Sequence, residues 1–581
     1  MKNPKLVFIC MLFIVSFIGC EEDEIPVKLS HPDSGFKSTI DDSSGDDGPI
    51  VLGDKINDPY KLENMQAAYD ALVKNGEISK SSSAVAKLTT THNYLRFLPK
   101  SAKELEILKS DTNLILFCHP LDYEIQQGGS YYEDPDLPKE AITALYCTVP
   151  VDYAIPAIDH ELIYSCFIPD VNEKTSMSES GLDADVLELL EDESYELTNT
   201  LSEEEIADVI QNGKKWKYPS GTFQIANHVT NKWIGVSRVR IKIWRATKTA
   251  WCWTNEAGYY KSGRSFRYDV HYKMNFESKD GFKIWGNWAF LNEATYDMGK
   301  HSKSGLSRDI ARNSGAWKWC AVNNAVQRYR AHASANNIAL PPSDLRVWVL
   351  ENNKLDHRVT GAAPMTKRCF GLYGFNTNSQ FNTFINYATG LNFVITNFGM
   401  LASTCMPDIF INVNSNETSI DNVYKTVFHE CAHASHWQKV GNSYWTKYIN
   451  YIITYGSFDN PYGRGTGLNA EFCGVGEMWG NYIGALFARN EFGWAGKYPF
   501  NKSWASSVGN LTELLEEDEG WYNPGFLRRC DNIADITTKD IYDCLVYNTN
   551  TFDKLIAALQ TKTTHDADVQ TQFNLTATDW P

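Results

Sequence analysis

The five residues His429-Glu430-Cys431-Ala432-His433 constrain this chain more than any other segment. They form an HExxH motif, which places two histidines four positions apart and a glutamate directly after the first. In a helix, side chains four residues apart lie on the same face, so both imidazoles can bind one metal ion. The glutamate is then placed to accept a proton from a water molecule on that ion. The motif therefore predicts a helix that carries a metal site.

The sequence around the motif supports a helix over about Ile420–Val440. Thr418 and Ser419 supply cap residues before it, and Gly441 follows where a left-handed cap residue is expected. Apolar residues recur on one stripe at helical spacing: Val423, Val427, Cys431 and Ala434. We expect the motif histidines and His436 on the opposite side, facing a cleft. The alternative is an amphipathic helix whose histidines are only solvated.

A catalytic zinc ion takes three protein ligands and leaves one position for water, so the motif needs a third ligand. The chain has no acidic residue between His433 and Asp459, which excludes a glutamate within the next few turns. We expect Glu477 as the ligand, because it begins a run with apolar residues at helical spacing and so projects from a rigid second helix. Asp459, in a turn-rich loop, and Glu471, in a glycine-flanked stretch, stay open as alternatives.

Strand candidates followed by an HExxH helix resemble the zincin metallopeptidases, and a distant glutamate on a second helix resembles their gluzincin branch. This resemblance implies one catalytic zinc ion held by His429, His433 and Glu477. It also implies that Glu430 is the general base and that the reaction is hydrolysis of peptide bonds. We therefore expect a zinc metalloendopeptidase that acts on a protein or peptide substrate.

Other zincin branches fit less well. His436 and Lys439 stand where the metzincin pattern has Gly and His. We therefore assign His436 to the cleft wall or to the residues that support the ligands, with exposed surface as the alternative. The segment around Asp459 resembles the aspzincin pattern, in which the aspartate is the ligand and Tyr462 steadies the oxyanion. The sequence leaves three candidates open for the oxyanion donor: Tyr462, Tyr482 and His436.

The first nineteen residues are typical of a signal peptide. Lys2 and Lys5 precede the apolar run Leu6–Val15, which is too short for a stop-transfer helix. Gly19 directly before Cys20 resembles a bacterial lipobox, which implies diacylglycerol on Cys20 and a protein anchored by lipid. An ordinary secretory signal is the alternative.

Residues 20–58 are acidic and rich in Asp, Ser, Gly and Pro, which predicts a flexible tether. The acidic run after the lipidated cysteine resembles the export signal of surface lipoproteins in some Gram-negative bacteria. We expect an outer-membrane lipoprotein exposed at the cell surface, with the periplasmic face as the alternative. The net charge of −17 argues against nucleic acid as a partner. Cysteine metal sites are not indicated, because the chain contains no CxxC pair.

The rest of the chain predicts a multidomain α+β protein. We expect a small N-terminal α/β domain with an acidic helical linker over residues 59–213 and a β-sandwich over residues 214–290. In the first we expect a helix from about Lys61 to Asn75 that Gly76 closes, and strands that include Leu114–Cys118. In the second, Val239, Ile241 and Ile243 alternate with Arg240, Lys242 and Trp244, which predicts a half-buried strand. The segment Thr254–Tyr260 resembles a turn of transthyretin-like or carboxypeptidase-regulatory-like sandwiches. Residues 291–581 would form the zincin-like domain, with strand candidates at Leu345–Leu350, Leu391–Thr396 and Asp408–Val413 ahead of the motif helix. The sequence does not indicate the oligomeric state.

A second class of function competes with the peptidase. Aromatic residues make up 13% of the chain, and exposed tryptophan and tyrosine rings can stack on sugars. The protein could then be a surface binding protein for a glycan or a host protein, with a zincin-like scaffold. The presence of Glu430 favours the enzyme, because metal binding alone does not need it.

Overall fold

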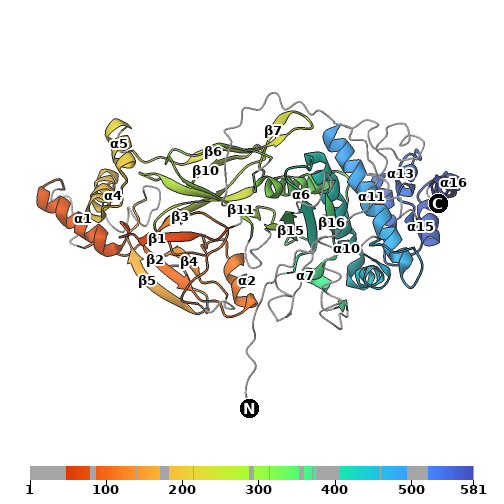
Figure 1. The fold of residues 1–581 in the computed structure, drawn as a ribbon, viewed down its shortest axis with the longest axis horizontal. Coiled ribbons are helices and arrows are strands. Elements are labelled where there is room, and N and C mark those ends of the chain that lie inside the picture. The colour runs from red at the N-terminus through yellow and green to blue at the C-terminus, as the bar shows by residue number, and fades with distance from the viewer. Residues whose placement is uncertain are drawn as a thin grey trace, which may run out of the picture. The chain divides into compact units, whose positions relative to one another are not determined.

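The structure is a computed structural model, and its fold is mixed α+β (Figure 1). It describes residues 48–78, 87–137, 142–170, 182–212, 215–286, 293–312, 314–351, 359–369, 372–373, 406–457, 460–493 and 521–579. The predicted signal peptide, Cys20 and most of the predicted tether lie outside the described residues. So do Asp459 and the strand candidate at residues 391–396.

The N-terminal part contains an antiparallel sheet of three strands, β4 (Leu145–Pro150), β2 (His92–Phe97) and β5 (His160–Cys166). A second, smaller sheet pairs β1 (Val51–Lys55) with β3 (Tyr123–Gln127). The helices are α1 (Leu62–Asn75), α2 (Ala102–Ser110), α4 (Ala184–Thr198) and α5 (Glu203–Asn212). α1 ends as predicted at Gly76, whose φ of 77° suits a residue without a Cβ atom.

One strand expected in this part is absent from the structure. Residues 114–118 make only an isolated bridge between Phe117 and Tyr146. The carbonyl of Leu114 accepts a hydrogen bond from Arg240 at 3.0 Å, and that of Leu116 accepts one from Lys242 at 2.7 Å. These carbonyls are satisfied by side chains of another segment, so the apolar run needs no strand partner.

Two sheets follow in the middle of the chain. The first contains β6 (Ser220–Asn227), β7 (Lys232–Gly235), β10 (Tyr259–Lys261) and β14 (Arg308–Ile310). The second has the order β16 (Thr360–Ala362), β17 (Ile409–Val413), β15 (Arg346–Glu351), β12 (Lys283–Trp285), β11 (Val270–Ser278), β8 (Val239–Arg245) and β9 (Lys248–Trp253), with β13 (Thr295–His301) paired to β11. The ring of Tyr260 lies 5.1 Å from that of Phe223 in the first sheet and 6.4 Å from that of Tyr272 in the second. The two sheets therefore share one aromatic core.

Strand β8 (Val239–Arg245) carries the predicted alternation but is buried on both faces. Ile241 and Ile243 point into the core, as expected. On the other face Arg240 is 7% exposed and Trp244 is 2% exposed. The expectation of a half-buried strand is wrong, because the N-terminal part covers this face and Trp244 belongs to its apolar cluster.

The sheets do not divide at residue 290, where the sequence predicted a boundary. β13 and β14 follow that residue, yet they pair with β11 and β6, which precede it. The strand-rich part thus extends to Ile310. The predicted turn in Thr254–Tyr260 does join β9 (Lys248–Trp253) to β10, and the side chain of Asn255 accepts hydrogen bonds from the backbone of Ala257 and Tyr259.

The C-terminal part begins with α6 (Trp317–Ala335) and continues the second sheet. β12 (Lys283–Trp285), β15 (Arg346–Glu351) and β17 (Ile409–Val413) are parallel, and β16 (Thr360–Ala362) pairs antiparallel to β17 at the end of the sheet. β15 and β17 confirm two strands predicted ahead of the motif helix. A short helix, α7 (Thr366–Cys369), follows β16.

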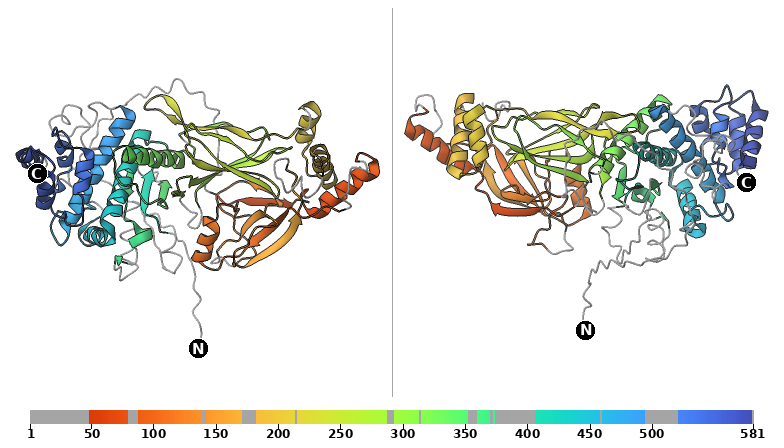
Figure 2. Two further views of the ribbon diagram at one scale, coloured as in Figure 1. Left: turned by 180° about the vertical axis from the view of Figure 1, so that it is seen from behind. Right: turned by 45° about the horizontal axis from the view of Figure 1, so that its top comes forward.

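Two long helices, α10 (Ile420–Tyr455) and α11 (Ala470–Phe492), pack along each other (Figure 1, Figure 2). They are followed by α13 (Phe526–Cys530), α14 (Thr538–Cys544), α15 (Phe552–Gln560) and α16 (Asp566–Asp579). Among the described residues, no helix combines the length and apolar character that crossing a membrane requires.

Candidate metal centre

The helix α10 forms as the sequence predicts around the motif. Ser419 is its N-cap, and the predicted apolar stripe, which includes Val423 and Cys431, is buried. Gly441 interrupts the helix with a φ of 75°, a value that suits glycine. Helical backbone then resumes and runs to Tyr455, so one predicted helix becomes two segments joined at a glycine.

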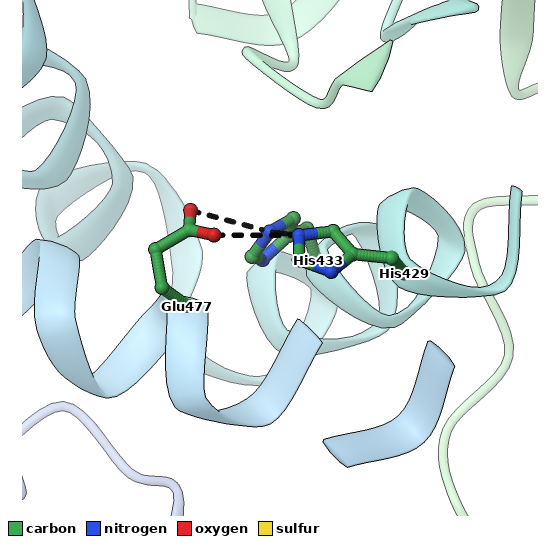
Figure 3. A group of neighbouring side chains, drawn as sticks. All are labelled: His429, His433 and Glu477. Atoms are coloured by element: carbon green, nitrogen blue, oxygen red, sulfur yellow. Dashed lines mark hydrogen bonds and ion pairs between the residues drawn. The ribbon is translucent and has the colours of Figure 1, made fainter. Parts of the chain in front are cut away.

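Three side chains from α10 and α11 converge at the motif (Figure 3). The Nε2 atoms of His429 and His433 lie 2.9 Å apart. Oε2 of Glu477 lies 3.3 Å from Nε2 of His429, and Oε1 lies 3.4 Å from Nε2 of His433. The structure thus brings together the three residues that the sequence proposed as ligands, two from one helix and one from the next.

These distances fit a single zinc ion. Zinc binds imidazole nitrogen and carboxylate oxygen at about 2.0–2.2 Å, so ligand atoms at tetrahedral angles lie about 3.4 Å from one another. The three measured separations lie close to this value. One carboxylate and two imidazoles also form a donor set that suits zinc, with a fourth position left for water.

Burial and charge set the electrostatics of the cluster. The side chains of His433 and Glu477 are 2% and 1% exposed, whereas that of His429 is 15% exposed. Burial lowers the pKa of His433, which favours the neutral imidazole that binds a metal. Burial alone would raise the pKa of Glu477, but His433 and His429 outweigh it and hold that pKa well below its usual range. These shifts favour the neutral imidazole of His433 and the carboxylate form of Glu477, which are the forms that bind a cation.

Gly480 allows α11 to approach the imidazoles. A Cβ atom at this position would lie 2.8 Å from ring atoms of both His429 and His433. Gly484, one turn further, would place a Cβ atom 3.1 Å from Cβ of His429. With Gly476 these residues form a glycine at every fourth position, which lines one face of α11. This repeat was a sequence signal for the close contact between the two helices, and the sequence reasoning missed it.

Tyr448 is a second residue that the sequence did not identify. Its hydroxyl donates a hydrogen bond to Oε1 of Glu477, and its ring lies 5.9 Å from that of His433. The residue is 4% exposed and belongs to the segment of α10 after Gly441. Tyr448 therefore orients the carboxylate of the third candidate ligand.

Glu430 lies between α10 and the end strand β16. A Cβ atom on Gly361 would lie 2.6 Å from Oε1 of Glu430, so the carboxylate rests against the backbone of β16. Glu430 is 4% exposed. The general base expected from the sequence thus stands beside the end strand, one residue from His429.

The remaining candidates lie elsewhere. Glu471 accepts a hydrogen bond from the backbone N–H of Phe552 at 2.7 Å, so it caps α15 rather than joining the ligand group. The hydroxyl of Tyr482 pairs with Thr538 at 3.0 Å, and the ring of Tyr462 lies 6.0 Å from that of Tyr522. Neither of these two contacts involves a candidate ligand.

His436 lies neither in a cleft wall nor on the exposed surface, so these two expectations are wrong. This residue is fully buried, and its ring lies 5.0 Å from that of Tyr444 and 5.8 Å from that of Trp445. Both rings come from the segment after Gly441, which folds over the side of α10 that was expected to face a cleft. Burial lowers the pKa of His436 to about 3.

Comparisons with known proteins add no assignment. No protein family matches the chain, and no curated protein matches it. The site is therefore interpreted from its own residues.

Proposed function

We propose that this protein is a zinc-dependent metallopeptidase that hydrolyses peptide bonds of extracellular proteins or peptides. The observation that carries the proposal is the convergence of His429, His433 and Glu477 at separations suited to one ion. In this proposal the chain has a small N-terminal α/β domain, a β-sandwich and a C-terminal zincin-like domain with gluzincin-like ligands.

The chemistry divides between the ion and Glu430. A zinc ion in this donor set would lower the pKa of a bound water to about 7 and polarise a peptide carbonyl. Glu430 accepts the proton of the attacking water and later delivers it to the nitrogen of the leaving amine. Burial of Glu430 beside Gly361 favours this role, because a carboxylate held in one place needs no reorganisation before it takes the proton.

The end strand β16 supports a peptide as the substrate. Among the described strands it pairs only with β17, and we propose that an extended substrate chain adds to its other edge. Thr360 is exposed, and Gly361 lies against Glu430. A peptide added to this edge would pass the general base.

We also propose that the enzyme is attached to the outer membrane through a diacylglycerol on Cys20 and that it faces the cell surface. The support is the sequence alone, since Cys20 lies outside the described residues. In a Cys20→Ala variant the protein should leave the membrane fraction. An unchanged membrane fraction would contradict the anchor and leave the peptidase proposal intact.

Removal and return of the metal test the enzymatic proposal. The purified protein is stripped with a chelator, dialysed, and incubated with a broad peptide library with and without added zinc. We expect cleavage only after zinc is restored at one ion per chain. Protein that binds no zinc, or that cleaves equally well without it, would contradict the proposal.

A further inference from the structure

A small cavity lies where the N-terminal part covers one face of the second sheet. Its volume is about 60 Å³. Side chains of β8, β11 and β13 form one wall, and the segment that contains Leu114, Leu116 and Phe117 forms much of the other. No residue of α10, α11 or β16 lines it, so the cavity is distinct from the candidate metal centre.

Positive charge predominates in the lining of this cavity. Its carboxylates are those of Asp111, Glu277 and Glu293, and its cationic side chains are Lys109, Arg240, Lys242, Lys273 and Lys283. Asp111 accepts a hydrogen bond from the hydroxyl of Tyr153 at 2.6 Å. The lining therefore contains five cationic side chains against three acidic ones.

Lys242 is the cation of this lining that no carboxylate neutralises in the described part of the chain. The residues directly opposite it in the sheet are Lys273 on β11 and Trp251 on β9, and neither brings negative charge. The other four cations each have a carboxylate partner: Lys109 and Lys283 bind Glu293, Arg240 binds Glu277, and Lys273 binds Asp297.

The partners of Lys242 are dipolar groups without a net charge. Its Nζ donates a hydrogen bond to the carbonyl oxygen of Leu116 at 2.7 Å and lies 5.4 Å from the centre of the Phe117 ring. An ammonium group has three N–H donors, so this hydrogen bond leaves two of them.

A buried amide lies next to Lys242 on the same face of the sheet. Asn275 is two residues after Lys273, the residue opposite Lys242, which makes the two side chains diagonal neighbours at about 7–8 Å. Asn275 is 3% exposed, lines the cavity and makes no side-chain hydrogen bond with the described residues. Lys242 keeps accessible surface although protein surrounds it, and this surface opens into the cavity.

A buried ammonium group without a negative charge beside it is costly. Burial, and next to it the charge of Arg240, lowers the pKa of Lys242 to about 7. An anion in the cavity would supply the missing charge. It would also accept hydrogen bonds from the ammonium group and from the amide N–H of Asn275.

We propose that this cavity binds one small inorganic anion, of the size of chloride, between Lys242 and the amide of Asn275. Small-molecule sites usually have volumes of about 300–1,000 Å³, so the cavity is too small for a sugar or a nucleotide. The surplus of positive charge disfavours a metal cation. The proposal does not depend on the peptidase activity.

Thermal unfolding of the full-length protein in sodium chloride and in sodium gluconate, at equal ionic strength and at pH 6, tests the site. Gluconate is too large for the cavity. We expect chloride to raise the unfolding temperature by about 2 °C relative to gluconate, because an anion that binds only the folded state stabilises it.

The effect of chloride should vanish in Lys242→Met, which removes the ammonium group and keeps an unbranched side chain. Lys232→Met is the matched control, because Lys232 is an exposed residue of β7 outside the cavity. The proposal is overturned if chloride gives no shift in the wild type, or if it shifts wild type and Lys242→Met equally.

A second measurement covers the case in which Lys242→Met does not fold. Crystals of the wild type grown in sodium bromide should show the anomalous signal of a bromide ion in the cavity, in contact with Nζ of Lys242. A cavity that contains only water in these crystals would also overturn the proposal.

Discussion

The hydroxyl of Tyr448 donates a hydrogen bond to the carboxylate of Glu477, across the contact between α10 and α11. One oxygen of that carboxylate thus contacts both the phenol and His433. The phenol fixes the orientation of the third ligand before any ion binds, because the whole group is buried.

Tyr448→Phe should therefore weaken zinc binding about 10- to 100-fold, the usual effect of losing a partner of a metal ligand. Competition with a chelator of known affinity measures the change. Tyr444→Phe is the control, because the hydroxyl of Tyr444 donates to the backbone carbonyl of Phe472 and not to a ligand. Equal zinc affinity in wild type and Tyr448→Phe would show that the hydrogen bond does not position Glu477.

Gly480→Ala should remove the metal site, whereas Gly476→Ala should not. The added methyl group at 480 would collide with both imidazoles at 2.8 Å, while at 476 its nearest neighbour is the Tyr448 ring at 3.8 Å. Alanine in a helix is favoured over glycine by about 1 kcal/mol, so Gly476→Ala should be neutral or stabilising. Zinc content and thermal unfolding of the two variants check this. Loss of zinc in both would point to damage of the helix contact as a whole.

Gly361→Ala should slow peptide cleavage while zinc stays bound. The new methyl group would lie 2.6 Å from Oε1 of Glu430 and would displace that carboxylate, and its three nearest neighbours are all atoms of Glu430 rather than of the candidate ligands. A fall in kcat of about 100-fold or more is expected from a misplaced general base. Gly263→Ala, where a Cβ atom meets no other group, controls for the substitution itself. If kcat is unchanged in Gly361→Ala, Glu430 does not transfer the proton.

The buried His436 should make the fold sensitive to acid. Its folded-state pKa of about 3 lies below the ordinary value of 6.5, so the unfolded chain binds more protons between these pH values. The contribution of His436 to the free energy of unfolding is therefore fully present above about pH 6.5, and it is lost as the pH drops toward 3. The loss from this residue is on the order of 4 kcal/mol.

Urea unfolding of metal-free protein at several pH values measures this effect. His436→Phe keeps a ring of similar size among Tyr444 and Trp445, and neither ring nitrogen of His436 has a hydrogen-bond partner to lose in the described structure. Between pH 6.5 and 4, the free energy of unfolding of the variant should fall less steeply with decreasing pH than that of the wild type. The difference in slope should correspond to about one bound proton. The same slope in wild type and variant would contradict a buried neutral His436.

The sequence predicted the three converging residues because local rules determine them. Helical spacing fixes His429 and His433 on one face, and the absence of acids before position 459 directs the search to Glu477. Periodicity also predicted the strands β15 and β17 ahead of α10. Helical spacing and strand periodicity depend on neighbours in the sequence, so one sequence is enough to find them. The acid-free gap only narrowed the choice of a third ligand, because the approach of Glu477 to the histidines depends on how α11 packs against α10.

The features that the sequence did not predict depend on tertiary packing. In α10, the segment after Gly441 packs against the segment before it. A helical wheel places His436 on a face but does not tell what covers that face, and here Tyr444 and Trp445 do. The contact of Tyr448 with Glu477 arises from the same change of direction. The burial of the second face of β8 was missed for a similar reason, because segments that are distant in the sequence pack against that face.

The most direct measurement of the central claim compares wild type with Glu430→Gln at equal zinc content on one peptide library. Glutamine keeps the size of the side chain but cannot take the proton of the attacking water. Our account predicts that both proteins hold one zinc ion per chain and that the variant cleaves about 100- to 10,000-fold more slowly. Cleavage by the variant at the wild-type rate, or a wild type that binds zinc and cleaves nothing, would contradict it.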